Sequence, residues 1–226
     1  GAQTYNSAVT LSAAATLNTS NSAVDFAGTV NGGFGLTVNA GSGPVTFTST
    51  VGNGAALASL TTTGPTTLDA DVTTVGAQTY NSAVTLGNSI ALTTSGNAVD
   101  FVGTLDAAAA GVQGLTIAAG AGTVTFGGAV GGAQALATLA VTGPTVISGG
   151  SVNTIGTQTY HSAVTLGADD TLTTSNSAVD FDGTVNGLSG LTVNAGGGAV
   201  TFGSSVGNAA ALTSLNVTGP TTLGGN

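Results

Sequence analysis

The sequence opens with GAQTYNSAVTL at residues 1–11, and the same eleven letters return at residues 76–86. A third copy, GTQTYHSAVTL, occupies residues 156–166. The copies start at Gly1, Gly76 and Gly156. A long period of about 75–80 residues is the signature of an array whose units bury one another's faces. We expect one continuous structure, a segment of a longer array, made of three sequence repeats at residues 1–75, 76–155 and 156–226.

A shorter period lies within each repeat. An aromatic or large aliphatic residue recurs with a period of 21 in the first and third repeats, and a longer loop stretches one step of the second repeat to 25. We expect these side chains to form a ladder in the core, at Tyr5, Phe26, Phe47, Leu68, Tyr80, Phe101, Phe126, Ile147, Tyr160, Phe181, Phe202 and Leu223.

The local pattern around each rung is aromatic-x-small-x-Val, as in Phe26-Ala27-Gly28-Thr29-Val30. Alternation with a period of two predicts a strand with one buried face. The pattern thus predicts that the aromatic ring, the small residue and the valine all point inward. The small residue would leave room for rings from the opposite wall.

Strands that recur at this period with equivalent residues in register predict a coil that stacks on itself. This is an all-β fold, the parallel β-helix or β-solenoid. With about 21 residues per coil, the chain makes about 10.8 coils and an axial length of roughly 50 Å. The many glycines oppose long helices, and an array of small β-sandwiches is the stronger rival.

The last step of the first two repeats is much shorter than 21. It runs only from Leu68 to Tyr80 in the first repeat, and from Ile147 to Tyr160 in the second. That step is either a short coil or a partial turn that shifts the frame.

Composition excludes several classes of partner. The chain has no Lys or Arg, nine acidic residues that are all Asp, and a net charge of −9. Without cations it cannot neutralise phosphates, which opposes binding to nucleic acid or to anionic membrane surfaces. No apolar run approaches the ~18 residues of a membrane-spanning helix, so we expect no membrane insertion in this segment.

Few residues are candidates for chemistry. Two acidic pairs, Asp69 with Asp71 and Asp169 with Asp170, could each hold a weakly bound Ca²⁺, and no other cofactor is expected. Asp25 and its counterparts in AVDF should be solvated, because they adjoin an inward ring. His161 has no second His or any Cys in the chain to complete a metal site. We therefore predict no catalytic residues and no enzyme.

The motifs G-x-Q-T-Y-x-S-A-V-T-L, A-V-D-F-x-G-T, L-T-V-N-A-G and L-x-V-T-G-P-T resemble the repeat regions of large bacterial surface proteins. These are the filamentous-haemagglutinin-like and autotransporter-like adhesins with β-strand repeats. The resemblance covers the whole chain. It implies a right-handed parallel β-helix, export, and a role in adhesion, biofilm matrix or surface fibres.

The leading hypothesis is a non-enzymatic, extracellular β-solenoid at the cell surface, the shaft or fibre of a secreted matrix protein or adhesin. Its partners would be adjacent repeats or identical copies stacked end to end into a filament. A glycan-binding adhesin module is the first alternative, with glycans or host and matrix surfaces as partners. Ice binding through the outward Thr columns and a polysaccharide-degrading β-helix are the others.

Overall fold

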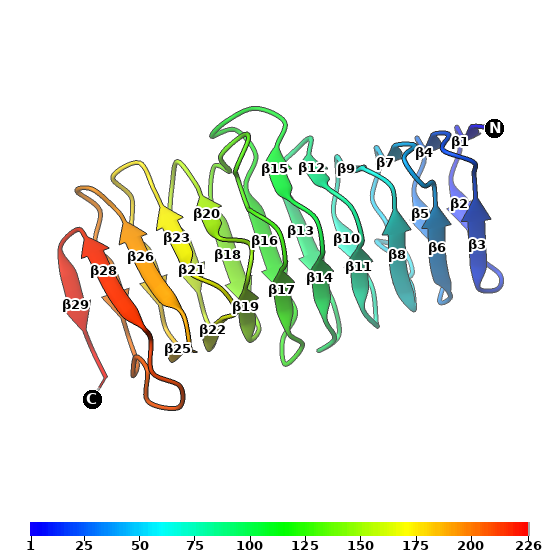
Figure 1. Ribbon diagram of the computed structural model, residues 1–226. Helices are drawn as coiled ribbons and strands as arrows, with labels where there is room; N and C mark the ends of the chain where they lie inside the picture. The colour runs from blue at the N-terminus through cyan, green and yellow to red at the C-terminus, as the bar shows by residue number, and fades with distance from the viewer. Residues whose placement is uncertain (226) are drawn as a thin grey trace.

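The computed structural model describes residues 1–225 as 29 short β-strands (Figure 1). These residues contain no helix, and hence none that could cross a bilayer. All pairings between strands are parallel, and equivalent strands lie one coil apart. The predicted β-solenoid with coils of about 21 residues is therefore confirmed. The rival array of β-sandwiches is wrong.

Each coil passes through three walls in turn. Wall 1 contains β1 (Gln3–Tyr5), β4 (Val24–Phe26), β7 (Val45–Phe47), β9 (Thr66–Leu68), β12 (Val84–Leu86), β15 (Leu105–Ala107), β20 (Ser151–Asn153), β23 (Asp170–Thr173), β26 (Gly190–Asn194) and β28 (Ser214–Thr218). Val130 bridges β15 to β20, so this wall is continuous over eleven levels.

Wall 2 follows wall 1 within every coil. It contains β2 (Val9–Thr10), β5 (Val30–Asn31), β10 (Val72–Thr73), β13 (Ile90–Thr93), β16 (Leu115–Ala118), β18 (Leu139–Thr142), β21 (Gln158–Tyr160), β24 (Val179–Phe181), β27 (Val200–Phe202) and β29 (Thr221–Leu223). Val51 bridges β5 to β10.

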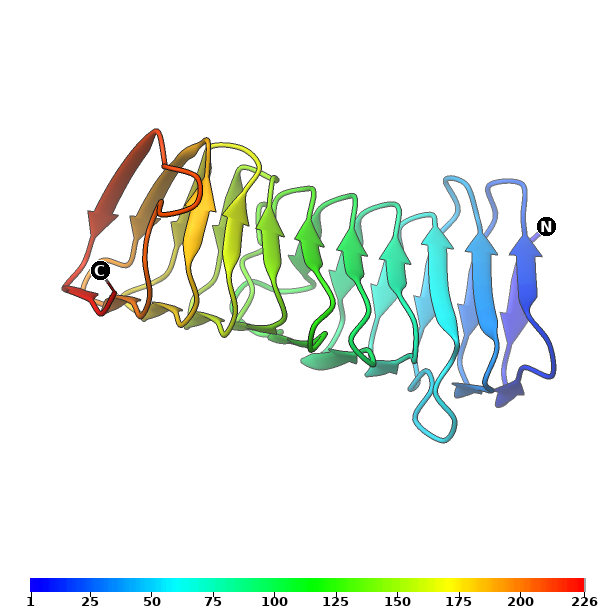
Figure 2. The same ribbon diagram turned by 90° about the horizontal axis from the view of Figure 1, so that it is seen from below.

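Wall 3 completes the coil. It contains β3 (Ala15–Asn18), β6 (Gly35–Asn39), β8 (Ser59–Thr63), β11 (Gln78–Tyr80), β14 (Val99–Phe101), β17 (Val124–Phe126), β19 (Thr145–Ile147), β22 (Val164–Leu166) and β25 (Val185–Gly187). Figure 2 shows the coils in a single row, with the two termini at opposite ends.

The core consists of ladders of identical or similar side chains along the axis. In the first repeat, the rings of Tyr5, Phe26 and Phe47 stack with centroids 4.9 and 5.0 Å apart and nearly parallel planes. The spacing follows the rise of parallel strands, which is about 4.8 Å. Each of the other two repeats contains an equivalent stack of one Tyr and two Phe rings.

The structure buries ten of the twelve side chains expected in the ladder. Tyr5 is partly buried and packs against the core. Leu223 is 70 % exposed, and the prediction that it lies in the core is wrong. Its counterparts Leu68 and Ile147 pair with a strand of the following coil, whereas within residues 1–225 β29 pairs only with β27.

The aromatic-x-small-x-Val pattern is a corner and not a single strand. Phe26 ends β4 on wall 1, whereas Val30 begins β5 on wall 2. Gly28 lies at the bend between them, only partly buried, so the prediction that the small residue points into the core is wrong. A Cβ on Gly28 would lie 2.3 Å from the carbonyl carbon of Ser7 in the coil before. The small residue is needed because backbones approach closely at this corner.

The short last step of a repeat has two effects. It shortens one coil, and it moves the strands of the next repeat onto a different wall. At the first boundary β11 pairs with β8, and the partner of Leu60 is Gln78, a step of 18 and not 21. Tyr5 lies on wall 1 of the first coil, and Tyr80 lies on wall 3 of the fourth. From the start of one repeat to the start of the next, the chain therefore completes three coils and then passes two further walls. The aromatic stacks of the three repeats consequently lie on walls 1, 3 and 2 in chain order.

Candidate functional site

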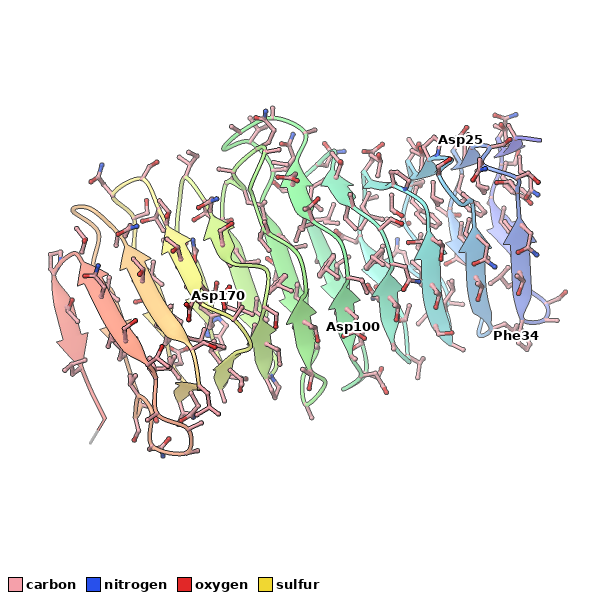
Figure 3. The ribbon with its side chains drawn as sticks, viewed as in Figure 1. Asp25, Phe34, Asp100 and Asp170 are labelled. Carbon is pink, nitrogen blue, oxygen red and sulfur yellow. The ribbon has the colours of Figure 1, made fainter. Side chains whose placement is uncertain are left out.

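The recurrent acidic residues of AVDF do not form a site. Asp25 lies on β4 of wall 1, Asp100 on β14 of wall 3 and Asp180 on β24 of wall 2. Figure 3 shows Asp25 and Asp100 at separate levels of the solenoid. Three equivalent carboxylates thus face three different directions. Residues 1–225 also enclose no detectable pocket.

The two acidic pairs accept hydrogen bonds from backbone amides of neighbouring coils. Oδ1 of Asp71 accepts from the amide of Ala91 at 2.8 Å. Oδ1 of Asp169 accepts from the amide of Gly190 at 2.6 Å. Residues 1–225 contain no group of three or more His, Cys, Asp or Glu side chains placed to hold a metal ion.

Asp170 differs from the other acidic residues because its side chain points inward. It is 2 % exposed, Oδ1 accepts from the amide of Gly150 at 2.8 Å, and Oδ2 is buried with no partner among the described residues. Desolvation raises its pKa from 3.8 to about 6, the Gly150 amide opposes the rise, and the charge of Asp169 adds to it. The sequence contains the signal: Asp170 follows Leu166 by four residues, as the buried Ile90 follows Leu86.

A buried glutamine lies at each repeat boundary and donates hydrogen bonds to backbone carbonyl oxygens of the neighbouring wall. The sequence-based interpretation missed these two residues. Gln78 is fully buried, and its Nε2 donates to the carbonyl oxygens of Val72 at 3.2 Å and Thr93 at 3.0 Å. Gln158 makes the equivalent bonds to Val152 and Thr173, both at 3.0 Å. Side chains alternate between inside and outside along a strand, and each glutamine lies two residues before an inward tyrosine. This spacing would have placed both glutamines inside.

His161 contacts a carboxylate of the next coil, and this is the one such contact of a basic side chain among the described residues. Its Nδ1 lies 2.7 Å from Oδ2 of Asp182 in the next coil, and both side chains are about half exposed. The pair is visible in the sequence, because its two members lie one period apart and each follows an inward ring. An exposed pair of this kind adds little to stability.

Large exposed apolar side chains include one in the loop before each of β6, β16 and β26. Phe34, the aromatic residue outside the three stacks, is 43 % exposed in the turn before β6 (Figure 3). The loops before the equivalent strands β16 and β26 also contain an exposed apolar residue, Val112 and Leu188 respectively. These three residues precede strands of walls 3, 2 and 1 respectively, so they do not gather into one patch.

The two ends of the solenoid present strand edges. Among the described residues, β1 pairs only with β4, and β28 pairs only with β26. Such an edge offers a row of backbone donors and acceptors to a further strand. No protein-family model, curated protein or solved structure shows significant similarity to this chain.

Proposed function

We propose that this chain is a structural, non-enzymatic β-solenoid, the shaft of a fibre outside a bacterial cell. The observation that carries the proposal is the continuity of all three walls through both repeat boundaries. β8 pairs with β11 at the first boundary and β18 pairs with β21 at the second, with the same parallel geometry as within a repeat. The repeats therefore form one rod and not three linked domains.

The mechanism is mechanical. Backbone hydrogen bonds between coils run along the axis, and stacked rings fill the interior at the same rise. Bending the rod must stretch bonds on one wall and compress the stacks behind another. Length grows with each added repeat without disturbing the packing of earlier ones, because each coil contacts only its neighbours.

Composition supports an extracellular setting. The chain has no Lys or Arg, so it offers no cleavage site to trypsin-like proteases, and it has no Cys or Met for oxidants to modify. The resemblance of the motifs to adhesin repeats also supports an extracellular location. Immunogold labelling of intact producing cells tests the location, and label confined to the cell interior would contradict it.

The shaft role is tested on the purified 226-residue chain by small-angle X-ray scattering and electron microscopy. We expect one rigid rod with an axial length of roughly 50 Å. A particle that hinges at the repeat boundaries would contradict the proposal. Release of reducing ends from a panel of polysaccharides would favour the degrading enzyme, and specific signals on a glycan array would favour the adhesin module.

A further inference from the structure

The two inner junctions between repeats are built from nearly the same sequence. The closing strands of one repeat, β8 and β9 in the first and β18 and β19 in the second, pair with the opening strands of the next. These opening strands are β11 and β12 in the second repeat, and β21 and β22 in the third. They differ at one position, because residues 78–86 read QTYNSAVTL and residues 158–166 read QTYHSAVTL.

Backbone hydrogen bonds across the two junctions also agree. The amide of Leu60 donates to the segment that opens the second repeat at 3.1 Å, and the equivalent amide of Leu139 donates to the third repeat at 3.0 Å. One wall further on, the amides of Thr66 and Thr145 both donate across their junctions at 2.8 Å. The backbone therefore does not distinguish the opening strands of the second repeat from those of the third.

The core does not distinguish them either. Both sets of opening strands turn a Gln, a Tyr, a Val and a Leu inward, and all of these side chains are buried. In packing and hydrogen bonding, the opening strands of the third repeat therefore fit the closing strands of the first. Repeats that fit one another in this way need a further feature to fix their order.

Charge is the feature that differs between the junctions. At the first junction, the acidic pair Asp69 and Asp71 follows β9 and lies beside the uncharged residues 87–91 of the next coil. Oδ1 of Asp71 accepts from the amide of Ala91 at 2.8 Å. Nδ2 of Asn88 donates to the carbonyl oxygen of Asp69, also at 2.8 Å. The acidic pair thus meets a neutral segment.

The second junction has the opposite arrangement. Residues 148–151, which follow β19, are Ser-Gly-Gly-Ser and carry no charge, and the acidic pair Asp169 and Asp170 lies in the next coil. Oδ1 of Asp170 accepts from the amide of Gly150 at 2.8 Å, and Oδ2 is buried with no partner among the described residues. Each junction therefore places one acidic pair against one neutral segment.

Docking of the third repeat on the first would bring the two acidic pairs together. Residues 167–171 would then replace residues 87–91 beside Asp69 and Asp71. Four carboxylates would share two neighbouring coils, which lie about 4.8 Å apart. The chain has no Lys or Arg to offset their repulsion. Oδ2 of Asp170, which already lacks a donor, would face additional negative charge.

We propose that the two acidic pairs fix the order of the repeats, because their repulsion prevents the third repeat from docking on the first. The competitor is a second copy of this chain, whose repeats offer the same opening strands during folding. Docking of a second repeat on the second repeat of another copy opposes two neutral segments and is not prevented. This inference goes beyond the shaft role, because it concerns how a rod is assembled.

Refolding two copies together tests the order, because the chain has no Cys of its own and single thiols can report each junction. One copy carries Thr61→Cys on a closing strand, and the other carries Thr79→Cys or Thr159→Cys on an opening strand. Thr61 pairs with Thr79 in the structure, and Thr159 is the equivalent of Thr79 in the third repeat. The tethered repeat has an effective concentration on the order of millimolar, so the copies are refolded from urea at about 1 mM.

We expect Thr61/Thr79 disulfides between copies under mild oxidation, and about tenfold fewer Thr61/Thr159 disulfides. Ala140→Cys with Thr79→Cys reports the junction of two neutral segments, since Ala140 is the equivalent of Thr61 and pairs with Thr159. It should crosslink as well as the Thr61/Thr79 pair. Thr61→Cys with Thr125→Cys is the negative control, because Thr125 lies on wall 3 inside a repeat and pairs with Asp100.

Neutral variants identify the cause. Asp69→Asn with Asp71→Asn on the Thr61→Cys copy should raise Thr61/Thr159 crosslinking to the level of the Thr61/Thr79 pair, because the amide oxygen still accepts from Ala91. Asp25→Asn with Asp100→Asn removes the same charge away from the two junctions. This matched control should leave the Thr61/Thr159 level low.

Two results would overturn the proposal directly. One is equal crosslinking of the Thr61/Thr79 and Thr61/Thr159 pairs before any Asp is replaced, and the other is no rescue by the Asp69→Asn/Asp71→Asn variant. Absence of every crosslink between copies, while a single chain with Thr61→Cys and Thr79→Cys closes its own disulfide, would show that the junctions do not exchange and would overturn it as well. Each of these results leaves the rigid rod and its shaft role intact, whereas hinged particles would reject the shaft role itself.

Discussion

The hydroxyl of Tyr80 donates a 3.1 Å hydrogen bond to Oε1 of Gln78, and both side chains are fully buried on wall 3 at the first repeat boundary. Nε2 of Gln78 donates in turn to backbone carbonyls of wall 2. One polar pair thus links two walls at the place where the repeat changes wall. Burial raises the pKa of Tyr80 far above its usual range, so the hydroxyl stays protonated and donates.

Tyr80→Phe removes this hydroxyl and leaves Oε1 of Gln78 buried without a donor. We expect a loss of about 1–3 kcal/mol in the free energy of unfolding, measured by urea denaturation. Tyr5→Phe is the matched control. It breaks the same bond, also 3.1 Å long, at a partly exposed site where water can replace the hydroxyl. We expect a change within about 0.5 kcal/mol there, and equal losses in the two variants would contradict this account.

Phe101→Ala tests the aromatic stack of the second repeat. The ring lies between those of Tyr80 and Phe126, with centroids 5.2 and 5.7 Å away, so its removal opens a cavity between two coils. We expect a loss of about 3–5 kcal/mol in thermal or urea unfolding. The neighbouring Val102 points outward and is exposed. Val102→Ala should change stability by about 0.5 kcal/mol or less.

Asp170 should make stability depend on pH. Its pKa is about 6 in the folded chain and near 3.8 when unfolded, so between these values the folded state binds more protons. Stability is then highest below pH 3.8, falls as pH rises through the window from about 4 to about 6, and is level above it. Two pKa units correspond to at most about 3 kcal/mol.

Asp170→Asn should remove this pH dependence, because the amide stays neutral while its oxygen still accepts from Gly150. Asp170→Ile restores the residue type of Ile90 and should stabilise the chain at pH 7. Unfolding curves of the three proteins at pH 4 and pH 7 make the comparison. A wild-type chain that gains stability between pH 4 and pH 7 relative to Asp170→Asn would contradict the sign.

Gly64→Ala tests the TGPT turn. Gly64 has a φ of +127°, and a Cβ there would lie 2.4 Å from the carbonyl oxygen of Gly43 in the coil before. We expect a loss of about 1–3 kcal/mol from backbone strain alone, with the clash adding to it. Gly33→Ala is the control, because a Cβ on Gly33 meets nothing within 4 Å. Circular dichroism during heating should separate the two variants clearly.

The axial register of the solenoid was predictable from spacing. Tyr5 pairs with Phe26 and Phe26 pairs with Phe47, with the same step of 21 in each case. A coil brings each residue beside the one a full turn later. The spacing between repeated inward rings therefore equals the number of residues in a turn.

The inward positions of Gln78 and Asp170 were harder to recognise. Both are polar, and polar residues are usually placed outside. In each case alternation along the strand outweighs polarity, because a side chain in a coil this tight has only two directions available.

Residue spacing thus establishes that the chain is a stacked coil, how long each turn is, and which rings form ladders. Only the packed structure decides where the corners lie and which wall each repeat occupies. Each repeat ends on a shortened turn, such as the step of 18 from Leu60 to Gln78, and the next repeat starts two walls further along the coil. The choice between walls depends on how backbones stack at the corners, as at Gly28, and on the bond from Gln78 to wall 2. Both are contacts between neighbouring coils, and they exist only after the chain has closed on itself.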